Sequence, residues 1–120
     1  MARLLTILLF SIVFGSASAQ NASIIGTWGL EGDPNLKMEF QSPNRCLHYF
    51  PGQPVEEFTY SIANTTPQCG TEVYIDQHTS YLTLTGSFGE ELCFEINGIT
   101  EKTLSITQLG RGGYMLFYRE

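Results

Sequence analysis

Gly26-Thr27-Trp28 opens the first strand-like run of the chain, and residues 114–119, YMLFYR, form the last one. In an all-β chain the first and last strands can pair, and this pairing closes the sheet into a barrel. The tryptophan at one end of the chain and Arg119 at the other would then meet, so that the guanidinium stacks on the ring of Trp28. We therefore expect these two side chains to close one end of a barrel.

The apolar residues between these runs recur at every second position, which is the period of a half-buried β-strand. Leu36, Met38 and Phe40, for example, alternate with polar side chains. This rhythm predicts eight strands, at residues 24–30, 36–41, 46–50, 57–62, 81–85, 91–96, 103–108 and 114–119. No segment shows a convincing helical period, so the chain is expected to be all-β.

Glycine, proline and asparagine separate the strand-like runs at regular intervals. Turns are expected at residues 32–35, 42–44, 51–54, 86–89, 97–98 and 110–113. Eight short strands joined by regular turns predict an antiparallel up-and-down β-barrel, because eight strands close a barrel of this kind.

The first nineteen residues have the features of a secretory signal peptide. Arg3 provides a positive charge, residues 4–14 are almost entirely apolar, and residues 17–19, ASA, match a cleavage site. The apolar run is shorter than the ~20 residues that span a bilayer, so cleavage is favoured over a membrane anchor. We expect a secreted or periplasmic protein with one domain at residues 20–120 and no membrane insertion.

The chain has three cysteines, Cys46, Cys69 and Cys93, and all of them follow the expected signal peptide. An odd number suggests one disulfide and one free thiol. Cys46 lies within an apolar run, where it can pack as a small buried hydrophobe, so a bridge between Cys69 and Cys93 is favoured. This bridge would pin the long irregular stretch at residues 63–80 to the barrel wall.

The chain is acidic, with six Lys and Arg against twelve Asp and Glu and a net charge of −6. Loss of Arg3 with the signal peptide makes the mature protein more negative still. Such a protein repels phosphate backbones and anionic lipid surfaces, which argues against nucleic-acid or membrane partners.

The sequence contains few of the residue patterns that catalytic sites require. His48 and His78 are the two histidines, and neither has the neighbours of a catalytic triad or a metal site. His48 lies in an expected strand, where a structural histidine is favoured over a ligand. Residues 110–113, GRGG, lack the Lys-Ser/Thr and helix of a phosphate loop and are better interpreted as a hairpin turn. We expect no enzyme activity, no cofactor and no metal.

The Gly26-Thr27-Trp28 motif, the terminal Arg119 and the strand rhythm together resemble the lipocalin (calycin) superfamily. The resemblance covers most of residues 24–119 and is closest to the short single-domain lipocalin-like proteins that are common in bacterial envelopes. It implies a non-enzymatic protein that binds a small apolar molecule at the open end of its barrel.

An eight-stranded barrel is wide enough either to be filled by its own side chains or to hold one small ligand. The side chains expected to contact a ligand are Met38, Phe40, Phe58, Tyr60 and Phe94, and among them Tyr60 offers a hydroxyl to orient a polar group. Short strands and bulky residues favour a small cavity or none. The alternative function is therefore a filled barrel that presents its loops to a protein partner.

Overall fold

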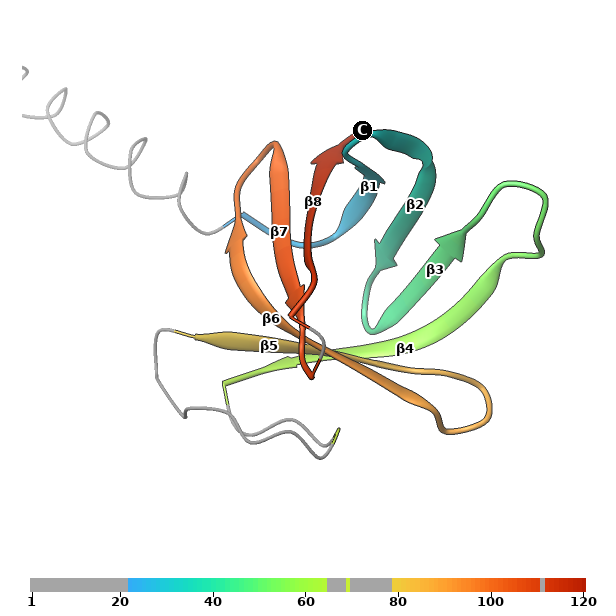
Figure 1. The fold of residues 1–120 in the computed structure, drawn as a ribbon. Helices are drawn as coiled ribbons and strands as arrows, with labels where there is room; N and C mark the ends of the chain where they lie inside the picture. The colour runs from blue at the N-terminus through green and yellow to red at the C-terminus, as the bar shows by residue number, and fades with distance from the viewer. Residues whose placement is uncertain (1–21, 65–68, 70–78, 111) are drawn as a thin grey trace, which may run out of the picture.

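The computed structural model describes residues 22–64, 69, 79–110 and 112–120 (Figure 1), and these form a closed barrel of eight strands in chain order. The strands are β1 (Gly26–Leu30), β2 (Asp33–Gln41), β3 (Arg45–Tyr49), β4 (Glu56–Ala63), β5 (Ser80–Thr85), β6 (Glu91–Ile99), β7 (Thr103–Gln108) and β8 (Tyr114–Arg119). Each strand is antiparallel to its neighbours, and β1 pairs with β8 to close the sheet. The predicted all-β up-and-down barrel is confirmed. The expected signal peptide at residues 1–19 and most of the loop at 63–80, including His78, lie outside the described residues.

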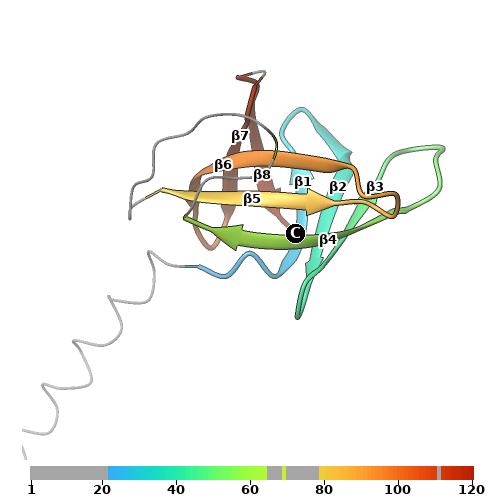
Figure 2. The same cartoon turned by 90° about the horizontal axis from the view of Figure 1, so that it is seen from below.

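The barrel has two ends with different connections. Strands β4, β5 and β6 lie side by side and cross the remaining strands steeply (Figures 1 and 2). Because the strands alternate in direction, the β1–β2, β3–β4, β5–β6 and β7–β8 connections share one end, which we call the open end. Residues 22–25 and the β2–β3 and β6–β7 connections lie at the opposite end, which we call the closed end.

The turn expected at residues 32–35 is wrong in extent, because β2 already begins at Asp33. The β1–β2 register shifts between Gly29 and Leu30: Gly29 pairs with Lys37, whereas Leu30 pairs with Asp33. The additional residues on β2 therefore form a bulge. A bulge tolerates proline within a strand, which explains why Pro34 does not end the pairing.

The turn expected at residues 97–98 is also wrong, since both residues lie in β6. A register shift between Ile96 and Gly98 leaves Asn97 at a bulge, where its side-chain amide donates to Thr107 Oγ1 at 2.8 Å. The chain turns instead at Thr100, whose hydroxyl oxygen accepts the backbone N–H of Thr103 at 2.9 Å. This local hydrogen bond favours the turn three residues later than the Asn-Gly pair suggested.

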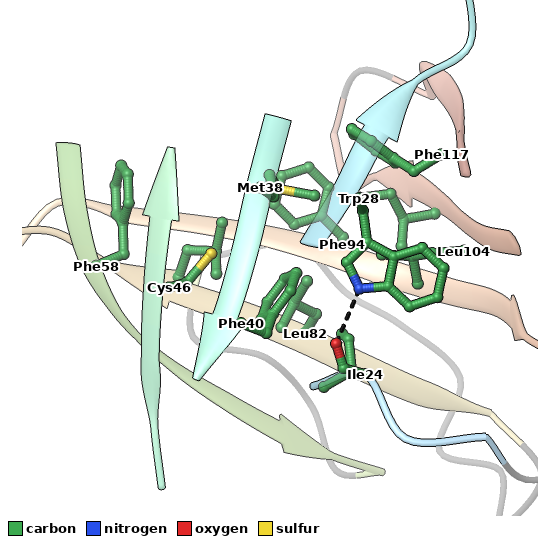
Figure 3. Packing of buried hydrophobic residues seen from close by; sticks show 12 residues of the cluster. Ile24, Trp28, Met38, Phe40, Cys46, Phe58, Leu82, Phe94, Leu104 and Phe117 are labelled. Carbon is green, nitrogen blue, oxygen red and sulfur yellow. Dashed lines mark hydrogen bonds between the residues drawn. The ribbon is translucent and has the colours of Figure 1, made fainter. Parts of the chain in front are cut away.

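Alternate residues of the strands point inward and form one hydrophobic core, as the period of two predicts. Trp28 and Leu104 are fully buried and lie at one side of this core, whereas Phe58 and Cys46 lie away from them (Figure 3). The buried cluster consists of Ile24, Trp28, Met38, Phe40, Cys46, Phe58, Leu82, Leu84, Phe94, Leu104, Ile106 and Phe117.

The predicted disulfide between Cys69 and Cys93 is confirmed, and Cys46 is a free, fully buried thiol. Burial raises the pKa of Cys46 to about 12, so it stays protonated and unreactive at neutral pH. The disulfide indicates an oxidising, non-cytoplasmic compartment. Within the described part of the chain, no helix is long and apolar enough to cross a membrane.

Candidate ligand-binding cavity

Trp28 and Arg119 meet at the closed end. They are direct partners across the β1–β8 pairing, and the Arg119 guanidinium carbon lies 4.1 Å from the centroid of the Trp28 ring. The ring nitrogen of Trp28 donates a hydrogen bond of 2.9 Å to the carbonyl of Ile24 (Figure 3). The structure therefore contains the stacked contact that the sequence led us to expect, with the tryptophan ring completely covered.

Arg119 also ties three separate chain segments together. Its Nη1 donates to the carbonyl of Ile25 at 2.8 Å and its Nη2 to that of Ser23 at 2.7 Å, both in the segment that leads into β1. Its Nε donates to the carbonyl of Glu101, in the β6–β7 turn, at 2.7 Å. One guanidinium thus joins β8 to the start of the barrel and to a neighbouring turn, and seals this end.

A cavity of about 440 Å³ enters the barrel interior from the open end. Its wall comes from the inward-facing residues of β1, β2, β3, β4, β6, β7 and β8 and from two of the connections. The lining residues are Leu30, Leu36, Lys37, Met38, His48, Phe50, Glu56, Phe58, Glu90, Leu92, Phe94, Ile106, Gln108, Met115 and Phe117. Ten of these fifteen side chains are apolar, so the cavity is a largely hydrophobic space with a polar rim.

Met38, Phe58 and Phe94 line this cavity, whereas the two other residues expected to contact a ligand do not. Phe40 and Tyr60 pack against each other edge to face, with ring centroids 5.1 Å apart, within the core. The hydroxyl of Tyr60 is therefore not among the polar groups that face the cavity. The expectation of a small or absent cavity is not met at the open end, where the cavity measures about 440 Å³.

His48 is the buried polar residue in the cavity wall. It lies on the inner face of β3, where alternation places it in line with Cys46, and only 9% of its surface is exposed. Its ring lies 4.5 Å from that of Phe58 and 5.9 Å from that of Phe50, measured between centroids. Its Nε2 is buried and has no hydrogen-bond partner among the residues that the structure describes. Burial lowers the pKa of His48 to about 4, so the imidazole is neutral at pH 7.

We did not single out His48 from the sequence as a binding residue. The inward direction of the His48 side chain was predictable, because the period of two that places Cys46 inward also places His48 inward. A histidine on the inner face of a short barrel strand needs a hydrogen-bond partner, and its register partners are Met38 on β2 and Glu56 on β4. The lack of a partner for Nε2 is therefore apparent only from the structure.

Charged side chains surround the mouth of the cavity. Glu56 on β4 and Glu90 in the β5–β6 connection contribute carboxylates, and Lys37 on β2 contributes an ammonium group. The Nζ of Lys37 lies 2.8 Å from a carboxylate oxygen of Glu120, so its charge is already paired. The described residues of the rim therefore carry a negative excess, which disfavours an anionic ligand.

A second hollow of about 530 Å³ is a shallow depression on the outer face of β1, β2 and β3. Two of its polar groups are already hydrogen-bonded to each other: Tyr49 donates its hydroxyl hydrogen to Glu39 at 2.7 Å, and Gln41 donates to the same carboxylate at 3.0 Å. The hydrogen bonds from Gln41 and Tyr49 hold the pKa of Glu39 below its usual value. We therefore consider the interior cavity the better candidate, although it is the smaller of the two.

Within the described residues, no group of three or more His, Cys, Asp or Glu side chains is arranged to hold a metal ion. Comparison of the chain with models of protein families, with characterised proteins and with solved structures found no match. The fold and the site therefore define this protein on their own, as a closed eight-stranded up-and-down barrel with an apolar cavity at one end.

The buried His48 should make the stability of the protein depend on pH. Its pKa is lowered in the folded state, so the unfolded chain binds more protons and stability falls as the pH drops below 6.5 towards 4. We expect proton binding to His48 in the unfolded chain to lower the free energy of unfolding by about 2 kcal/mol between pH 7 and pH 5. Urea unfolding of wild type and His48→Leu at both pH values measures this difference. The carboxylates are common to both proteins, so equal pH dependence in the two would contradict the prediction.

Proposed function

We propose that this protein binds and carries a small, mainly apolar molecule in the cavity at the open end of its barrel. The observation that supports the proposal is the cavity itself. Its volume of about 440 Å³ lies within the roughly 300–1,000 Å³ of small-molecule sites, and its wall is mostly apolar with a few polar groups. Burial of apolar ligand surface against this wall supplies the driving force, at roughly 25 cal/mol for each Å² removed from water.

We further infer that the protein is a secreted or periplasmic, non-enzymatic member of the lipocalin-like (calycin) group. The contact between Trp28 and Arg119 at the closed end, the eight-stranded barrel and a cavity at the opposite end all support this assignment. Residues 1–19 would act as the signal peptide, and the disulfide between Cys69 and Cys93 is consistent with export.

The carrier proposal predicts that filling the cavity weakens binding while an equal change on the outer face does not. Met115 lines the cavity, whereas its neighbour Leu116 on β8 points to the other face of the sheet. We expect Met115→Trp to weaken binding of the hydrophobic probe Nile red by roughly tenfold or more, and Leu116→Trp to leave it unchanged. Fluorescence titration of the mature proteins, with a circular dichroism spectrum of each, measures both effects.

Two outcomes would contradict this proposal. If wild-type protein binds no Nile red and retains no small molecule in native mass spectrometry, the cavity is not a binding site. If Met115→Trp and Leu116→Trp weaken the binding equally while both remain folded, the probe binds elsewhere on the barrel.

A protein-interaction module is the second candidate function, and the loops of the open end favour it. Phe88, in the β5–β6 connection, is 95% exposed, and Val55, next to the start of β4, is 51% exposed. The β3–β4 and β5–β6 connections project from the same end of the barrel (Figures 1 and 2). Exposed apolar side chains on neighbouring loops are typical of surfaces that contact a partner. Native protein that binds neither probe nor small molecule would make this function the better one.

A further inference from the structure

A buried polar atom without a hydrogen-bond partner among the described residues belongs to one of the residues that line the cavity, His48. His48 Nε2 is buried and has no partner within the described residues, although its residue lines the cavity. Buried polar atoms are nearly always hydrogen-bonded, and an exception calls for an explanation. The rings of Phe58 and Phe50 flank the imidazole and cannot serve as partners for this nitrogen. A group on a bound molecule can supply the missing hydrogen bond once the imidazole ring turns to present Nε2, which is covered in this structure, to the cavity.

We infer that the ligands of this cavity are neutral apolar alcohols, bound with the hydroxyl hydrogen-bonded to His48 Nε2 and the hydrocarbon part against the surrounding apolar wall. This inference rests on the proposed function, because it takes the cavity as the binding site. It adds the chemical class of the ligand and the residue that recognises it.

The choice of a hydroxyl follows from the two tautomers of a neutral imidazole. If the proton is on Nδ1, Nε2 is an acceptor and needs a donor; if the proton is on Nε2, this nitrogen needs an acceptor. A hydroxyl can donate or accept and therefore satisfies either tautomer. An ether or ketone oxygen only accepts, so it fits one tautomer alone.

The charges that face the cavity favour a neutral head group. On β4, Glu56 is the register partner of His48, and Glu90 contributes a second carboxylate before β6. On β2, Lys37 is ion-paired with Glu120, and on β3 the free thiol of Cys46 is protonated. The imidazole itself is uncharged at neutral pH. Among the described residues that line the cavity, an anionic head would meet two carboxylates and no unpaired cation, so a carboxylate ligand is disfavoured relative to the alcohol.

Three probes built on a ten-carbon chain test this assignment: decanol, decyl methyl ether and decanoate. Their dissociation constants are measured by displacement of Nile red from wild type and from His48→Leu at pH 7. We expect wild type to bind decanol about tenfold more tightly than the ether, since the ether cannot donate the hydrogen bond that Nε2 accepts when the proton is on Nδ1, and to bind decanoate more weakly still. His48→Leu should lose this preference for decanol.

The outcomes separate this inference from the proposed function. Equal binding of decanol and the ether by wild type would overturn the assignment of alcohols as the ligands, while the carrier function stands. A preference for decanol that persists in His48→Leu would overturn the role of His48. Failure of all probes and of Nile red to bind wild type would instead contradict the carrier function itself.

A measurement on wild type keeps the inference testable if His48→Leu does not fold. The chain has two histidines, so the ¹⁵N signals of the imidazole rings are few and can be assigned. We expect saturating decanol to shift the Nε2 resonance of His48, and decyl methyl ether to shift it less. An Nε2 resonance that responds equally to both probes would overturn the proposed hydrogen bond.

Discussion

Arg119→Ala is expected to lower the free energy of unfolding by about 4 kcal/mol, because it removes a cation–π contact and three short hydrogen bonds at once. The guanidinium lies over the ring of Trp28 and holds the carbonyls of Ser23, Ile25 and Glu101. These partners belong to the segment before β1 and to the β6–β7 turn, so their loss loosens the closed end and the β1–β8 seam together. Urea unfolding monitored by circular dichroism measures the change.

Arg45→Ala is the matched control for this loss. Arg45 lies on the surface, where it forms an ion pair with Glu57 at 3.1 Å, and both side chains are about half exposed. Such pairs contribute about 1 kcal/mol or less. The loss of unfolding free energy in Arg119→Lys should lie between the losses in the two alanine variants, since lysine keeps the charge but not the planar fork of donors. Similar losses for Arg119→Ala and Arg45→Ala would show that Arg119 does not hold the closed end together.

The strands and the face to which each side chain points could be predicted from local patterns. Alternation along each strand is a property of a few consecutive residues, and it assigns each side chain to the inner or outer face without knowledge of its neighbours. Trp28 and Arg119 added the long-range link, since their stacking requires the first and last strands to pair. Thr103–Gln108 and Tyr114–Arg119 consequently have the bounds that the sequence predicted.

Strand ends were less predictable because bulges change how two strands pair. The turn signals at residues 32–35 and 97–98 are genuine local preferences, yet both segments continue in strands across a shift in register. Pairing with the neighbouring strand supplies hydrogen bonds that outweigh the local preference. The amino-acid sequence of one chain does not show where the pairing of two strands will shift in register.

The position of the cavity could not be predicted from the alternation of apolar and polar residues. Met38 and Phe40 share the inner face, but Met38 lines the cavity and Phe40 lies in the packed core. Their difference is one of height along the barrel axis, which the stagger between strands determines. The same limit applies to His48, whose inward direction was predictable but whose unpartnered Nε2 became visible only once its neighbours were placed.

The disulfide should be the other large contribution to stability. Cys69 and Cys93 are separated by 24 residues, and a cross-link over this distance restricts the unfolded chain by an amount equivalent to about 3.5 kcal/mol at 25 °C. Cys93 lies on β6 between the inward-facing Leu92 and Phe94, so its side chain points to the outer face of the sheet. The bridge therefore attaches Cys69 to the outside of the barrel without occupying the cavity.

The double variant Cys69→Ala, Cys93→Ala is expected to lose about 3 kcal/mol of unfolding free energy and to keep its affinity for Nile red, because the cross-link lies on the face of β6 opposite the cavity. Reductant should destabilise wild type and Cys46→Ala, which both retain the bridge, and should leave the double variant unchanged. Thiol titration should find one reactive group in wild type, and only after unfolding, since Cys46 is fully buried.

A double variant as stable as wild type would mean that the cross-link contributes no net stability. Loss of Nile red binding in a folded double variant would mean that the bridge supports the cavity wall from outside, because relaxation of β6 would then move Leu92 and Phe94 with it.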